Sequence, residues 1–150
     1  MASKNVQDLN SREVYLTVLN FLKMAFRKGS QKINAKDWNS FKDKLGATSL
    51  SPETANAVSL WTMENLFCHK PSRVQPRALQ EFEERIFSGT VHSEFVEAVL
   101  FGMVSEIQGE NILDEFLETS SQAVAPERML SSLSRMWARN IQGYQSVKVS

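Results

Sequence analysis

The sequence TVHSEFVEAVLFGMVSEIQG, residues Thr90 to Gly109, places apolar side chains on almost every face of the helix that it predicts. Its strongly polar residues gather near the two ends, where Thr90 can cap the helix and Gly109 can end it. A helix that is apolar nearly all round in a soluble chain belongs in the core. We therefore predict one central helix over Thr90 to Gly109, against which the other helices pack.

Further helical segments flank this stretch, and each is bounded by a capping residue, a proline or a glycine. Among these, Asn34 is expected to cap one helix, Pro52 to begin another, and Gly29 and Gly143 to end two more. No segment alternates apolar and polar residues over the length of a useful strand. We expect an all-α fold in a single domain of residues 1–150: a bundle of about seven helices around the central one. The flanking helices are predicted over residues 11–28, 35–45, 52–70, 76–88, 110–118 and 126–142.

The overall composition favours a cytoplasmic protein. Lys and Arg together number 17, as do Asp and Glu, so no net charge attracts nucleic acid through its phosphates. The single cysteine, Cys68, rules out an internal disulfide and suits a reducing compartment. The chain starts without an apolar signal region, and its longest apolar run, Ala98–Val104, is far shorter than the ~20 residues that span a bilayer. We expect no nucleic-acid partner and no stable membrane span in this chain.

No motif for catalysis, metal binding or a cofactor stands out. Cys68 and His69 are neighbours and His92 lies apart, so a zinc site would need a tertiary coincidence, and a core cysteine beside a helix-end histidine is the simpler interpretation. There is no glycine-rich phosphate loop and no HExxH. We expect neither an enzyme nor a bound metal or cofactor.

Two segments in the second half of the chain carry a pattern at long spacing. Gly89 is followed by an apolar pair and then by Phe101-Gly102, and Trp137 stands seven residues before Tyr144 in a Gly-Tyr pair. They resemble the first and second homology motifs of the Bcl-2 family of apoptosis regulators. The four-residue signature of the first motif is absent, because Val91 to Glu94 reads Val-His-Ser-Glu.

Two segments in the first half agree in order with that pattern. Leu60 and Phe67 keep the outer residues of the third motif, whereas its Gly-Asp is replaced by Glu64-Asn65. The stretch from Arg12 to Gly29 resembles the amino-terminal motif. The chain thus resembles a divergent Bcl-2 family member, and the eroded signatures are similar to those of viral homologues.

The resemblance implies a hydrophobic surface groove that receives the amphipathic third-homology (BH3) helix of a pro-apoptotic protein. It implies an anti-apoptotic protein that sequesters this helix by burying its apolar face, in the cytoplasm or at the mitochondrial outer membrane through partners. A second copy in a homodimer is a further expected occupant. For Val96 and Val99, a position in the core is the better interpretation. The groove residues that the resemblance implies are Leu60, Met63, Phe67, Leu79, Phe82, Ile86, Phe95, Val96 and Val99.

Glu94 is the sharpest departure from the family pattern. The family places an arginine there, which pairs with an aspartate of the ligand helix, so here two carboxylates would face each other and disfavour binding. Arg85 is the nearest cation by sequence that could substitute. We expect weakened or selective binding.

Three other interpretations stay open. A protein of the same fold promotes death by inserting into membranes, which a liposome assay detects. A viral interaction module of this fold inhibits host signalling through a helix face. An unrelated helical scaffold or capsid subunit would form large assemblies and bind no helical peptide.

Overall fold

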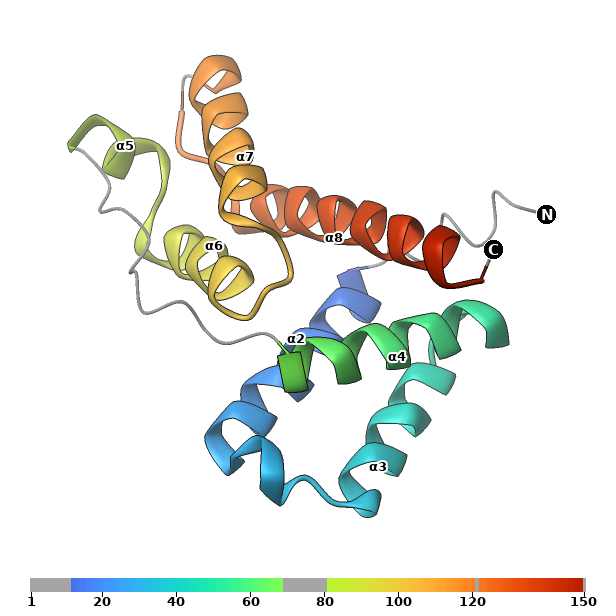
Figure 1. The fold of residues 1–150 in the computed structure, drawn as a ribbon. Helices are drawn as coiled ribbons and strands as arrows, with labels where there is room; N and C mark the ends of the chain where they lie inside the picture. The colour runs from blue at the N-terminus through green and yellow to red at the C-terminus, as the bar shows by residue number, and fades with distance from the viewer. Residues whose placement is uncertain (1–11, 69–80, 121, 150) are drawn as a thin grey trace.

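The structure, a computed structural model, describes residues 12–68, 81–120 and 122–149, without the side chains of residues 30, 81, 82, 84, 148 and 149. Within these ranges every regular element is helical, so the all-α prediction is confirmed for the described part of the chain (Figure 1). The elements are α2 (Arg12–Lys28), the 3₁₀ turn η1 (Ser30–Lys32), α3 (Ala35–Gly46), α4 (Pro52–Cys68), α5 (Glu81–Ile86), α6 (Gly89–Leu100), α7 (Glu106–Thr119) and α8 (Pro126–Val149).

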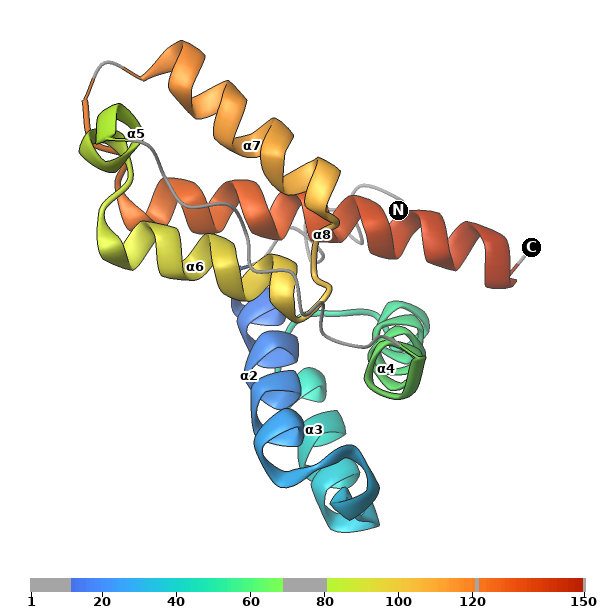
Figure 2. The same ribbon diagram turned by 60° about the vertical axis from the view of Figure 1, so that its left-hand side comes forward.

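The helix that organises the packing is α8. It packs against α2, α4, α6 and α7, and Figures 1 and 2 show it passing between α7 on one side and α2 and α4 on the other. Met129, Leu133, Trp137 and Ile141 recur every four residues on its inner face and are fully buried. The Trp137 ring lies at the centre, with its centroid 6.1 Å from that of Tyr15 and 5.8 Å from that of Trp61.

The predicted central helix over Thr90 to Gly109 is wrong, because the chain turns between α6 and α7. The amide of Gly102 donates to the Val99 carbonyl and the amide of Met103 donates to the Ala98 carbonyl, which is the Schellman pattern of a helix end. Gly102 has a φ of 76°, in the left-handed region that glycine adopts without a steric penalty. The break therefore has a local cause.

The second of these helices, α7, begins with a reciprocal cap. The amide of Gln108 donates to Ser105 Oγ over 3.1 Å, while the amide of Ser105 donates to Gln108 Oε1 over 3.0 Å. This capping box satisfies two backbone donors at the helix start. Gly109, predicted to end a helix, lies inside α7 instead.

The first of them, α6, buries one face only. Ser88, rather than Thr90, caps it by accepting a hydrogen bond from the amide of Val91. Val91, Phe95 and Ala98 are buried on the inner face, whereas Val96 and Val99 are only partly buried. The helix thus flanks the core that α8 organises.

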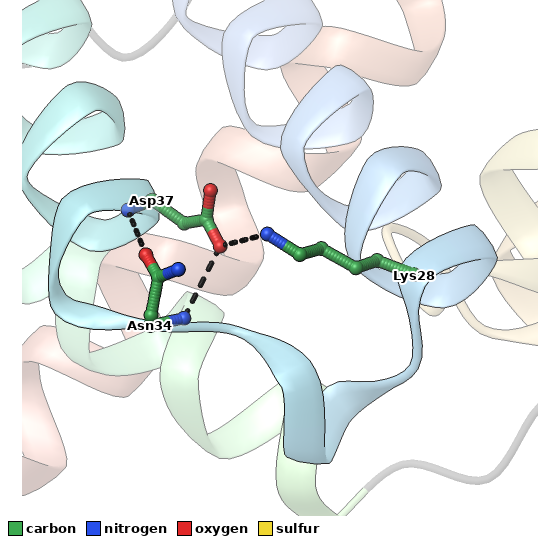
Figure 3. A network of polar contacts seen from close by, with 3 residues as sticks. All are labelled: Lys28, Asn34 and Asp37. Atoms are coloured by element: carbon green, nitrogen blue, oxygen red, sulfur yellow. Dashed lines mark hydrogen bonds and ion pairs between the residues drawn. The ribbon is translucent and has the colours of Figure 1, made fainter.

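The first half of the chain follows its predicted boundaries. The expected helices over residues 11–28 and 35–45 appear as α2 and α3, and Asn34 caps α3 as predicted. Figure 3 shows the junction: Asp37 Oδ2 accepts from Lys28 Nζ over 2.7 Å and from the amide of Asn34 over 3.1 Å. The hydrogen bond from Lys28, followed by that from Asn34, lowers the pKa of the Asp37 carboxyl. A charged contact therefore ties the end of α2 to the start of α3.

The last helix extends further than predicted. Gly143 was expected to break it, but α8 continues to Val149. The predicted helix over residues 76–88 is described only from Glu81, as the short α5, and its earlier part lies outside the described residues.

Candidate helix-binding surface

Three of the predicted groove residues form an exposed apolar row on α4, which we call the α4 stripe: Leu60, Met63 and Phe67. Their exposed fractions are 44%, 38% and 58%. They stand at i, i+3 and i+7, so they share one face of the helix. The opposite face carries Val58 and Thr62, which are fully buried.

The position of α4 explains why the stripe stays exposed. The helix packs against α2, α3 and α8, and Figures 1 and 2 show it on the side of α8 that is opposite to α7. Trp61, one residue after Leu60, points the other way and meets Trp137 of α8 edge to face. The packing of one face therefore fixes the outward direction of the other.

A cavity of about 370 Å³ lies beside the α4 stripe. It runs between α4 and the last turns of α8, because Trp61 and Cys68 line it on one side and Tyr144 on the other. At its inner end the Asn65 side-chain amide donates to the Phe101 carbonyl over 2.9 Å, which ties α4 to the turn after α6. Sequence reasoning placed Tyr144 in a motif but missed this cavity, although Trp61, Glu64 and Cys68 share one side of a helix by their spacing.

The other predicted groove residues do not join the stripe. Phe95 is buried, and Ile86, Val96 and Val99 are partly buried and pack against the core cluster. The main packing contacts of α4 are with α2, α3 and α8, so these residues lie on helices other than those against which α4 chiefly packs. Arg85 is exposed, whereas Leu79 and the side chain of Phe82 lie outside the described residues.

Glu94 lies at the contact of α6 with the start of α8. Its pKa is raised by burial first and by the nearby carboxylates of Glu127 and Glu97 second. Its Oε2 atom is buried without a hydrogen-bond partner in the described part of the chain. The Tyr15 hydroxyl is in the same situation, and its pKa is raised by burial and by the charge of Glu94.

This placement separates Glu94 from the α4 stripe. The stripe's helix meets the middle of α8, where Trp61 contacts Trp137, whereas Glu127 is in the first turn of α8. A ten-residue separation along a helix corresponds to roughly 15 Å. The carboxylate of Glu127 that acts on Glu94 thus lies nearer the start of α8 than the contact between Trp61 and Trp137 does.

Comparison of the chain with protein-family models, with curated proteins and with solved structures finds no match. Among the described residues, none of the helices is both long and apolar enough to span a bilayer. The same residues contain no group of three or more His, Cys, Asp or Glu side chains placed to hold a metal ion. The functional argument therefore rests on the surface geometry and on the sequence resemblance.

Proposed function

We propose that this protein binds an amphipathic helix of a partner protein on the α4 stripe. The observation that carries the proposal is the exposure of Leu60, Met63 and Phe67 in one row. Apolar anchors at i, i+3 and i+7 spacing are the complement of a helix that presents its own apolar face. Binding would remove these side chains from water without any chemical step.

The partner that we propose is the BH3 helix of a pro-apoptotic protein, which the protein would sequester as a survival factor. This identity comes from the sequence resemblance alone, since the division of Thr90 to Gly109 into α6 and α7 departs from the central helix of that family's plan. Leu60 and Phe67 belong both to the resemblance and to the exposed row. Both the sequence resemblance and the exposed apolar row therefore point to α4 as the binding helix.

The stripe alone supports only weak binding. Full burial of one large apolar side chain is worth about 2 kcal/mol, and these three side chains are already about half buried, so together they supply about 3 kcal/mol. Micromolar affinity corresponds to about 8 kcal/mol. We therefore expect the bound helix to reach into the cavity lined by Trp61 and Tyr144 as well, and to bind in the micromolar range.

The test is a titration of fluorescently labelled BH3 peptides, measured by anisotropy, against the wild type and single variants. Phe67→Ser and Leu60→Ser are each expected to weaken binding about fivefold, since each removes about 1 kcal/mol of apolar burial. The matched control is Ile107→Ser, because Ile107 is an exposed apolar residue, 75% accessible, on α7. Equal binding by Phe67→Ser and the wild type would reject the α4 stripe, and no binding by any peptide would reject the proposed partner.

Two further measurements separate the alternatives. Glu94→Arg is expected to leave the peptide affinity unchanged, because the nearby carboxylate of Glu127 lies in the first turn of α8, whereas α4 meets α8 at Trp137. Sizing of the unliganded protein tests the second copy as the occupant. A dimer that Phe67→Ser dissociates would show that the stripe is a self-association surface and would overturn the partner-helix proposal.

A further inference from the structure

A cavity of about 450 Å³ lies on the other side of α8, between that helix and α7. Figures 1 and 2 show the two helices crossing near the start of α7 and spreading apart toward the segment that joins them. Arg128 and Arg135 line the cavity from α8, and Arg12 lines it from the start of α2. Three guanidinium groups from two elements thus surround one hollow.

None of these three arginines forms an ion pair within the described residues. Two of them are held in place by other contacts: the guanidinium of Arg128 lies 5.4 Å from the centroid of the Phe116 ring, and Arg135 Nε donates to the Ser131 carbonyl over 3.4 Å. A guanidinium that is already oriented loses less conformational entropy when it binds an anion. The cavity is therefore prepared for a group rich in acceptor oxygens.

The other residues that line the cavity restrict the class of ligand that it can bind. The hydroxyl groups of Ser131 and Ser132 add further donors, whereas that of Thr119 donates to the Glu115 carbonyl over 2.8 Å. Glu115 and Glu127 add two carboxylates. Three guanidinium groups against two carboxylates leave a modest positive balance. A doubly charged phosphate has three terminal oxygens, so it can accept bidentate hydrogen bonds from more guanidinium groups than a single carboxylate can.

The volume leaves room for more than a phosphate group. Cavities that hold small molecules usually measure about 300 to 1,000 Å³, and this one lies within that range. The two glutamates can accept hydrogen bonds from hydroxyl or amine groups on the organic part of the ligand.

We propose that the cavity between α7 and α8 binds a phosphate monoester, with its phosphate among Arg12, Arg128 and Arg135. This site is independent of the helix-binding function, because it shares no residue with α4 or with the cavity beside it. Loss of one activity by substitution therefore leaves the other intact.

The experiment is a calorimetric titration of the full chain with phenyl phosphate, glycerol 3-phosphate and inorganic phosphate. Binding of the aromatic ester, the aliphatic ester or both, more tightly than inorganic phosphate, is the expected result. Arg128→Gln and Arg135→Gln are each expected to weaken it about tenfold, because each removes a charge-assisted hydrogen bond to phosphate. Both residues are exposed, so the variants are expected to fold, which far-UV circular dichroism checks.

The matched control is Arg139→Gln, which removes an exposed arginine one turn further along α8 and outside the cavity. It is expected to bind phenyl phosphate as the wild type does. The proposal is overturned if no ester binds at millimolar concentration, if inorganic phosphate binds as tightly as the esters, or if Arg139→Gln weakens binding as much as the cavity variants do.

Discussion

The close crossing of α6 and α7 can be tested at a single glycine, Gly109. A Cβ atom at this position would lie 2.8 Å from Phe95 Cε2 and 3.0 Å from Val99 Cγ2, closer than packed carbon atoms approach. Phe95 is 4% exposed and belongs to the core, so its ring has no free space into which to move. We expect Gly109→Ala to destabilise the fold although alanine favours the helix.

The magnitude follows from two opposing effects. Replacing a glycine in a helix interior by alanine gains about 1 kcal/mol. Forcing an extra carbon into a packed core costs about 1 to 3 kcal/mol. The net expected change is a loss of about 1 kcal/mol, or about 2–4 °C in the melting temperature of a chain of this size.

The partner substitution Phe95→Leu shows whether the loss comes from this contact. Leucine lacks the two ring carbons that crowd the site, whereas Val99 Cγ2 remains 3.0 Å from the added carbon, so in that background Gly109→Ala is expected to cost less than in the wild type. The two changes should therefore couple by about 1 to 3 kcal/mol. If Gly109 instead ended one long helix in a left-handed conformation, alanine would cost the same with or without the Phe95 ring.

The assay is urea unfolding followed by far-UV circular dichroism, with the slope m compared among variants. The matched control is Gly143→Ala, because a Cβ atom at Gly143 meets nothing within 4 Å inside α8. This control is expected to stabilise the protein by about 0.5 to 1 kcal/mol. Stabilisation by Gly109→Ala in the wild-type background would refute the close α6–α7 contact, and destabilisation by Gly143→Ala would refute the continuation of α8.

Three further predictions concern the turn, the buried carboxylate and the α3 cap. Gly102→Ala is expected to cost about 1–2 kcal/mol in thermal unfolding, because its φ of 76° crowds a Cβ atom; an unchanged melting temperature would contradict this conformation. Glu94→Gln is expected to stabilise the protein at pH 7, because the raised pKa of Glu94 means that its ionised form disfavours the folded state. That gain should shrink as the pH falls through the raised pKa of Glu94, because the wild-type carboxyl then takes up a proton, and a gain that stays constant with pH would contradict this reasoning. Asn34→Ala is expected to cost about 1 kcal/mol in urea unfolding, since it removes the acceptor of the Asp37 amide; no loss would show that the cap contributes nothing.

The helix ends that were predicted correctly are those with a local cause. Gly29 has a φ of 95° after α2, and Asn34 with Asp37 closes a capping box at the start of α3. Pro52 begins α4, as proline at a first helical position favours. In each case a side chain or a glycine within a few residues decides the boundary, so the local sequence is enough to predict where the helix begins or ends.

The missed break after α6 also had local signals. Gly102 is the glycine of a Schellman motif, and Ser105 with Gln108 is a capping box three residues further on. The long apolar pattern of Thr90 to Gly109 outweighed these signals in the sequence interpretation. Apolar side chains at every helical angle do not require one helix, because two short helices that cross also bury residues on different faces.

The central position of α8 could not be predicted in the same way. Its apolar side chains form one narrow row, typical of an amphipathic helix at a surface. Trp137 in that row is buried because Tyr15 and Trp61 approach it from two other helices. Burial of this kind depends on the arrangement of distant segments, so no local pattern reveals it.

The candidate surface, too, could be predicted from the sequence only in part. The spacing of Leu60, Met63 and Phe67 predicts that they share a helix face, and the structure shows that face exposed. The same reasoning could not show that Phe95 belongs to the core, because the sequence pattern of a groove residue on a helix is the same as that of a core residue. Only the direction in which each helix packs distinguishes the two.

The packing direction of α4 also explains why the exposure of the α4 stripe is informative. A single exposed apolar residue such as Ile107, which is 75% accessible, is ordinary on a protein surface. The stripe differs because Leu60, Met63 and Phe67 stand together on a helix whose other face is already packed against α2, α3 and α8. Core packing therefore cannot account for their apolar character, whereas a contiguous apolar row beside a cavity is typical of an interaction surface.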